Sequence, residues 1–172
     1  MEAIDIDGRR HRVSRKELAW RPSAYAVIIR DAKVLLVPQK ARGFDLPGGG
    51  VEFGESLAEA VEREVREETG LRVEAFPVAA VQESFFIWAP DDPLRRAAYQ
   101  CHMFYMPATV IGGELSTLGF DPREQQDLDL ARWIPLGELG AIEVASSCDF
   151  RPVVEAIAAA GQSHVRAIPV AD

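Results

Sequence analysis

Cysteine is scarce in this sequence, and long apolar runs are absent. The two cysteines, Cys101 and Cys148, cannot by themselves build a disulfide framework or a zinc site. No segment approaches the roughly 18–20 consecutive apolar residues of a membrane-spanning helix. The start of the chain also lacks the basic and apolar regions of a secretory signal. We therefore expect a soluble, cytoplasmic protein with no membrane partner.

The chain also lacks an excess of basic residues. It has 19 Lys and Arg against 27 Asp and Glu, which gives a net charge of −8 over 172 residues. An acidic protein is a poor binder of polyanions, so we expect no general nucleic-acid binding. Hydrophobic residues make up 48% of the chain, which is enough for a core, and the length fits a single domain.

The negative charge is concentrated in two short segments. Residues 52–68 hold seven glutamates and two arginines, a net charge of −5, and residues 121–129 hold four acids and one arginine, a net charge of −3. Together they account for the whole excess, so the rest of the chain is neutral. Charge placed merely for solubility would be more evenly spread, and this distribution points toward a cation site.

The residue pattern predicts an α/β protein with a mixed sheet and helices packed on its faces. A helix is expected from Leu57 to Thr69, because Ser56 and Glu59 form a capping-box pattern and Gly70 supplies a stop. Strands are predicted at Ala24–Ile29, Val34–Val37, Val73–Val81, Glu83–Trp88, Gln100–Ala108 and Ala131–Pro135. We also expect a late helix at Arg151–Ala160 and an N-terminal hairpin that turns at Asp7-Gly8.

Three glutamates share one face of the predicted helix. Glu64, Glu67 and Glu68 stand at i, i+3 and i+4, a spacing that brings their carboxylates together. Without a partner they repel one another, whereas a hard divalent cation such as Mg²⁺ takes oxygen ligands and bridges carboxylates to phosphate. The glycine-rich loop at 46–50, just before the helix, lets backbone approach an anion or offer a carbonyl to a metal.

The segment from Gly49 to Leu71 resembles the Nudix box in every defined position. Gly49 is followed after five residues by Glu55, and after seven more by Arg-Glu-Val-Arg-Glu-Glu-Thr-Gly-Leu at 63–71. The flanks at 26–37 and 131–139 are similar to those of the family as well. The resemblance covers about residues 22–160, which leaves an N-terminal arm or small hairpin at 1–21 and a C-terminal tail at 161–172.

This resemblance implies an α/β/α sandwich in which the box forms loop-helix-loop. It also implies hydrolysis, dependent on Mg²⁺ or Mn²⁺, of a nucleoside diphosphate linked to another moiety. The implied metal ligands are the Gly48 carbonyl, Glu64, Glu67 and Glu68. Glu64, or an acid from another loop, would activate the attacking water. By the same analogy, Arg63 binds Glu55 in a salt bridge that joins loop to helix, and the supporting residues are Gly49, Glu55 and Gly70.

Candidates outside the box are less sharply defined. Family members often complete the metal site with a carboxylate from beyond the box, and Asp127 and Glu124 lie where one is expected, although solvated loop charges fit them as well. Aromatic side chains could stack a base, and an arginine of the N-terminal arm could contact phosphate. The candidates for substrate binding, each of which could equally be a core or solvated residue, are Phe44, Phe86, Trp88 and Arg21.

The residues leave two functional alternatives and several substrates open. One alternative is an active pyrophosphohydrolase, and the other is a Nudix-fold sensor that binds a nucleotide without cleaving it. For the enzyme, ADP-ribose or nucleotide sugars, nucleoside triphosphates and dinucleoside polyphosphates all remain possible substrates. Homodimers are common in the family, and the N-terminal arm could take part in one.

Overall fold

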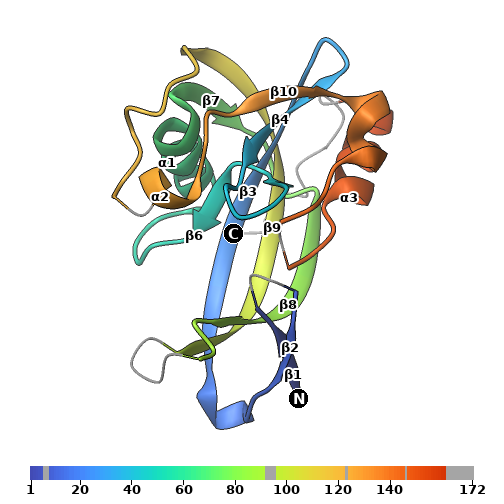
Figure 1. The fold of residues 1–172 in the computed structure, drawn as a ribbon. Helices are drawn as coiled ribbons and strands as arrows, with labels where there is room; N and C mark the ends of the chain where they lie inside the picture. Colours follow the sequence, from blue (N-terminus) through green and yellow to red (C-terminus); the bar gives the residue numbers. More distant parts are fainter. Residues whose placement is uncertain (6–7, 92–95, 123, 146, 162–172) are drawn as a thin grey trace, which may run out of the picture.

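A single mixed sheet organises the described part of the chain, which comprises residues 1–5, 8–91, 96–122, 124–145 and 147–161 of this computed structural model (Figure 1). Its strands are β1 (Glu2–Ile4), β2 (Arg10–Arg12), β3 (Leu18–Arg30), β4 (Lys33–Pro38), β5 (Phe44–Asp45), β6 (Gly48–Gly50), β7 (Leu71–Ala75), β8 (Ala80–Trp88), β9 (Ala97–Gly113) and β10 (Arg132–Pro135). The helices are α1 (Leu57–Thr69), α2 (Glu124–Asp127) and α3 (Arg151–Ala160), with short 3₁₀ turns η1 (Arg15–Glu17) and η2 (Leu136–Ala141).

The long strands β3 and β9 form the centre of the sheet. They run parallel from the pair Leu18–Ala98 to the pair Ile28–Ala108, and the strand order around them is β10-β4-β3-β9-β8-β1-β2. The short strand β6 pairs with β3, β5 pairs with β4, and β7 pairs with β9. Helices α1 and α3 lie on opposite sides of this sheet in Figure 1. The predicted α/β sandwich with a mixed sheet is confirmed.

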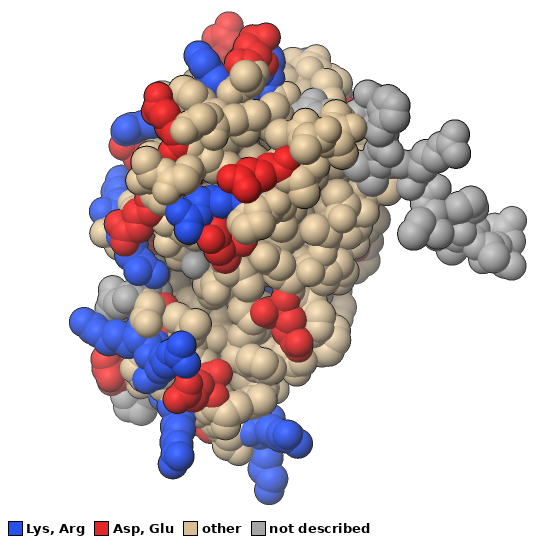
Figure 2. Space-filling model, turned by 90° about the vertical axis from the view of Figure 1, so that its right-hand side faces the viewer, with Lys and Arg blue, Asp and Glu red and all other residues tan. Residues whose placement is uncertain are grey.

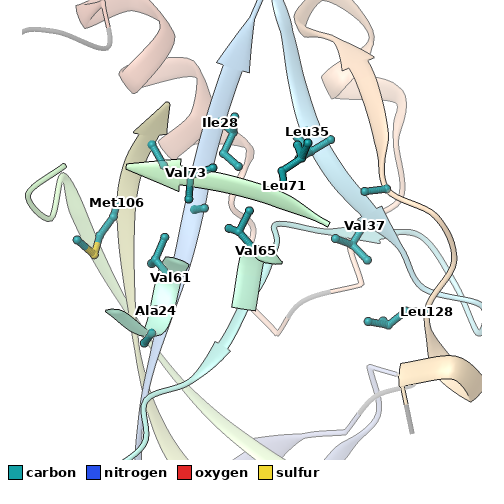
Figure 3. Close-up of a cluster of buried hydrophobic side chains, with 14 of the residues drawn as sticks. Ala24, Ile28, Leu35, Val37, Val61, Val65, Leu71, Val73, Met106 and Leu128 are labelled. Atoms are coloured by element: carbon teal, nitrogen blue, oxygen red, sulfur yellow. The ribbon is translucent and has the colours of Figure 1, made fainter. Parts of the chain in front are cut away.

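Alternation along β3 divides the interior into two layers. Ala24, Ala26 and Ile28 face α1, where Val61 and Val65 cover them, as Figure 3 shows for the labelled members of this cluster. The intervening side chains point to the other face, where the buried residues include Val154 and Ile157 of α3. Because successive side chains of a strand alternate between faces, one strand supplies both layers.

Helix α1 has the limits that its sequence predicts. The Ser56 hydroxyl accepts a hydrogen bond from the Glu59 amide and the Glu59 carboxylate accepts one from the Ser56 amide, which completes the capping box. The helix ends at Gly70, whose φ of 76° lies in the left-handed region. Its apolar stripe is buried in the first core layer, while among its glutamates Glu62 is exposed, Glu64 and Glu67 are partly exposed and Glu68 is buried.

The strands that come after the helix differ in extent from the prediction. The segment 73–81 was expected as one strand, but β7 ends at Ala75 and β8 begins at Ala80. Pro77 lies between them and has no N–H for a ladder, while Phe76 and Ala79 still donate to carbonyls of β9. Strand β9 is longer than expected, because it pairs with β3 on one side and with β7 and β8 on the other.

The N-terminal residues extend the sheet. Strands β1 and β2 pair antiparallel, as expected of a hairpin, while Asp7 of the expected Asp7-Gly8 turn and its neighbour Ile6 lie outside the described residues. Strand β3 begins at Leu18 and continues without a break to Arg30, so it crosses the expected boundary between residues 21 and 22. Figure 2 shows basic side chains gathered at the lower end of the molecule. Strands β1 and β2 and the turn η1 lie at this same end in Figure 1.

None of the helices in the described ranges combines the length and the apolar composition needed to cross a membrane.

Candidate functional site

Arg63 is the centre of the polar network on α1. Its guanidinium binds both carboxylate oxygens of Glu55 at 2.8 and 3.1 Å, and it also donates to Glu64 at 2.8 Å and to Glu67 at 3.1 Å. A further N–H group donates to the Gly50 carbonyl at 3.0 Å. These bonds raise the pKa of Arg63, with the Glu55 bond as the largest cause, and the same bond lowers the pKa of Glu55. The guanidinium thus joins the glycine loop to the glutamate face of α1.

The glycine loop lies directly against the glutamates. The Glu68 carboxylate, which is buried, accepts a hydrogen bond from the Gly48 amide at 3.0 Å. A Cβ atom at Gly49 would lie 2.6 Å from a carboxylate oxygen of Glu64, closer than such atoms can stand. Only glycine therefore allows the loop and the Glu64 side chain to occupy their present positions.

The donor set suits a hard divalent cation. The box presents carboxylate oxygens from Glu64, Glu67 and Glu68 beside loop backbone, and oxygen ligands of this kind are those that Mg²⁺ and Mn²⁺ prefer. Within the described ranges, no three Asp, Glu, His or Cys side chains already converge on one position fit for a metal. Instead, the Arg63 guanidinium binds Glu64 and Glu67, and the Gly48 amide binds Glu68.

A cavity of about 390 Å³ lies on the face of the sheet opposite α1. Its floor comes from the β3 side chains that point away from α1, namely Arg21, Ser23 and Tyr25, and from their neighbours on β9 and β8. Aromatic side chains line part of it, and the lining also includes Gln39, Ala41, Arg42, Asp45 and Asp127. We call this cavity the trough.

Arg21 connects the trough with the box. Its guanidinium lies over the Tyr99 ring, with its central carbon 5.4 Å from the ring centroid. On the other side, a Cβ atom at Gly50 would lie 3.4 Å from Arg21 Nη2, so the same guanidinium stands against the glycine loop. Since the Gly50 carbonyl binds Arg63, a short chain of contacts leads from the trough to the box glutamates.

The structure brings most of the sequence candidates to these two places. The box residues Gly48, Gly49, Glu55, Arg63, Glu64, Glu67 and Glu68 meet at the loop and α1, and Gly70 ends the helix. Phe86, Trp88, Arg21 and Asp127 line the trough. Phe44 instead packs, partly buried, against the core layer beneath α3. The Glu124 side chain lies outside the described residues.

Several trough residues were not anticipated. Asp45, Tyr99 and Ser23 line the cavity, but none belongs to a motif. Tyr99 and Phe86 are register partners on neighbouring strands, so alternation along β9 would have placed Tyr99 beside Phe86 once that register was known. Asp45 carried one usable signal, because it immediately precedes the Leu-Pro-Gly-Gly entry to the box.

The chain combines a mixed sheet covered by helices with a glycine loop that is hydrogen-bonded to a helix rich in glutamate. This combination is the one expected of a Nudix protein. The NUDIX domain profile matches residues 19–152, and the chain belongs to the Nudix family. It is 37% identical over 108 residues to the ADP-ribose pyrophosphatase of Methanocaldococcus jannaschii, which covers 60% of this chain and 59% of that protein. It is 33% identical over 156 residues to a putative nudix hydrolase of Caenorhabditis elegans, which covers 85% of this chain and 38% of that one.

These two relatives are longer than the matched region, so the chain spans less than two thirds of either. Among solved structures, the crystal structure of an ADP-ribose pyrophosphatase from Streptococcus suis superposes with a TM-score of 0.56. It is 20% identical in sequence, and the match covers 83% of this chain and 93% of that one. This likeness supports the fold assignment.

Proposed function

We propose that the chain is a divalent-metal-dependent pyrophosphohydrolase that acts on a nucleoside diphosphate linked to another moiety. The observation that carries the proposal is the arrangement around Arg63, which holds a glycine loop against three helix carboxylates beside a trough with an arginine at its junction. Family membership supports the same reaction class.

The box residues would bind the metal and activate the attacking water. Glu64, Glu67, Glu68 and the Gly48 carbonyl would hold Mg²⁺ or Mn²⁺, with Asp127 and Glu124 as proposed further ligands. When bound, such ions neutralise the diphosphate and lower the pKa of a bound water. Glu64 accepts the proton of the attacking water. Arg63 positions Glu64 and Glu67, and it must exchange hydrogen bonds with them when they turn toward a cation.

The substrate we favour is ADP-ribose or a similar nucleotide sugar, because the M. jannaschii relative is named an ADP-ribose pyrophosphatase. The oxygen of one water forms a bond to phosphorus, the phosphoanhydride bond breaks, and two phosphomonoesters leave. Phe86 and Trp88 would stack the base, and Arg21 would meet the phosphates at the junction with the box.

A hydrolysis screen tests this proposal. Wild type, Glu67→Gln and Glu62→Gln are assayed with ADP-ribose, nucleoside triphosphates and dinucleoside polyphosphates, each with Mg²⁺ and with Mn²⁺. Glu62 is the matched control, since it is an exposed glutamate on the same helix. We expect wild type and Glu62→Gln to turn over at least one substrate, and Glu67→Gln to lose about a hundredfold or more in kcat.

The screen also tests the sensor alternative. A Nudix-fold sensor would bind one of these nucleotides, as measured by calorimetry, and would hydrolyse none of them with either metal. That result would overturn the proposed enzyme activity.

A further inference from the structure

The trough has an aromatic end. Phe86 and Trp88 of β8 form a tilted pair with ring centroids 6.3 Å apart, and Tyr99 of β9 is the register partner of Phe86. All three rings line the cavity. Flat apolar faces of this kind favour a nucleobase, since stacking works for any planar ring.

The opposite end of the trough carries Asp45 beside Tyr25. Asp45 pairs with Val37 through β5, and its Oδ1 atom accepts a hydrogen bond from the Leu46 amide at 2.8 Å, so its carboxylate is held in place. It lines the cavity together with Tyr25. Burial raises the pKa of the Tyr25 phenol, and the nearby Asp45 carboxylate raises it further.

The register of the sheet separates the two ends. Tyr25 pairs with Tyr105 on β9, whereas Phe86 pairs with Tyr99, so the ends lie six residues apart along one strand. At a rise of about 3.3 Å per residue, this distance is about 20 Å. Arg21 pairs with Cys101 and therefore lies between the ends, where it stands against the box loop.

The order along the trough is therefore aromatic rings, arginine and carboxylate. We propose, resting on the function proposed above, that Asp45 is a specificity-determining residue that selects substrates whose diphosphate ends in a neutral, hydroxyl-bearing group over nucleoside triphosphates. A base at the aromatic end and a diphosphate at Arg21 leave the group beyond the diphosphate facing Asp45.

The charges explain the direction of this selection. An ionised carboxylate only accepts hydrogen bonds, so it binds the hydroxyls of a sugar and repels a terminal phosphate. Arg42 also lines the trough, but Glu143 approaches it to 3.8 Å and offsets part of its charge. Discrimination thus comes from a repulsive contact as well as an attractive one.

ADP-ribose and ATP make a sharp test, because they share adenosine and two phosphates and differ only in the group attached to the second phosphate. We would measure kcat/KM for both with Mg²⁺ in wild type, Asp45→Asn, Asp45→Ala and Asp31→Asn. Asp31→Asn is the matched control: it removes the same charge from the exposed turn between β3 and β4, away from the trough lining. Thermal unfolding of each variant confirms that it is folded.

We expect wild type and Asp31→Asn to prefer ADP-ribose. In Asp45→Asn the ratio of the two kcat/KM values should fall about tenfold or more, mainly through a gain with ATP. Asp45→Ala should lower the ratio as well, with a larger loss on ADP-ribose because the acceptor is gone. A wild-type preference for ATP, or an unchanged ratio in an active Asp45→Asn, overturns this inference while the proposed hydrolase activity stands.

If wild type hydrolyses neither compound, the proposed activity fails, and calorimetric binding of ADP-ribose and of ATP then tests the trough separately. Tighter binding of ADP-ribose that is lost in Asp45→Asn supports the assignment. Equal binding of both compounds, or a preference that Asp45→Asn retains, rejects it.

Discussion

At the scale of single residues, Arg63 holds together parts of the box that would otherwise repel. One guanidinium meets the carboxylates of Glu55, Glu64 and Glu67 and a loop carbonyl. A planar fork with several donors can do this, whereas the point charge of a lysine cannot. These hydrogen bonds to Arg63 require ionised carboxylates. For Glu55, the bond to Arg63 lowers the pKa, so protonation of Glu55 should destabilise the folded chain.

The Glu55 bond should make stability depend on pH. Because Arg63 lowers the folded-state pKa of Glu55 below its unfolded value, the stability that this carboxylate contributes is complete above about pH 4.5 and is lost as pH falls through the folded-state pKa. We expect wild type to exceed Glu55→Gln in free energy of unfolding at pH 6 and the gap to narrow by pH 3. Urea unfolding of both proteins at a series of pH values measures this difference in free energy of unfolding. A difference that stays constant down to pH 3 would contradict a stabilising bond between Glu55 and Arg63.

At the scale of elements, the predictable parts are those whose signals are local. Helix α1 is specified by its capping box and Gly70, and the box residues meet because they lie within one loop and one helix. The limits of β7, β8 and β9 were predicted less well, because pairing partners far along the chain decide where a strand stops. Tyr99 lines the trough because β9 pairs with β8, and Asp45 because β5 pairs with β4, so apart from the place of Asp45 just before the glycine loop the sequence carries no signal for either.

Gly70 offers a test of how far α1 depends on its C-terminal stop. The φ of 76° disfavours any side chain, and a Cβ atom there would lie 2.4 Å from the Glu114 carbonyl. We expect Gly70→Ala to lower the free energy of unfolding by more than about 1 kcal/mol.

Gly137→Ala is the control for this change, since nothing lies within 4 Å of a Cβ atom at that position. Chemical denaturation compares the two variants. Equal losses in both would show that the left-handed turn contributes nothing.

At the scale of the whole molecule, the net charge of −8 falls on two segments. One forms the box face of α1, and the other places Asp127 at the trough. The box glutamates share one face of α1, and a divalent cation bound there would offset their mutual repulsion. Metal binding should therefore stabilise the whole fold rather than one loop.

Thermal unfolding with and without Mg²⁺ or Mn²⁺ measures this effect. At a metal concentration ten times Kd, the added stability is about 1.4 kcal/mol, which corresponds to a rise in Tm of about 3–6 °C for a chain of this size. A Glu67→Gln, Glu68→Gln double variant should lose most of the rise. A wild-type Tm that responds to neither metal, even with ADP-ribose present, would count against the metal site.

The alternation along β3 has a consequence for how this molecule can change. Ala24, Ala26 and Ile28 belong to the core under α1, and Arg21, Ser23 and Tyr25 belong to the trough. Inserting one residue at the start of β3 would exchange the faces of the two sets, so that the packing under α1 and the lining of the trough would be lost together. New substrate specificities are therefore expected to arise by substitution of trough residues without a change in the length of β3. They could also arise by insertions or deletions in the segment 39–43, which borders the trough and contributes no residue to the buried core.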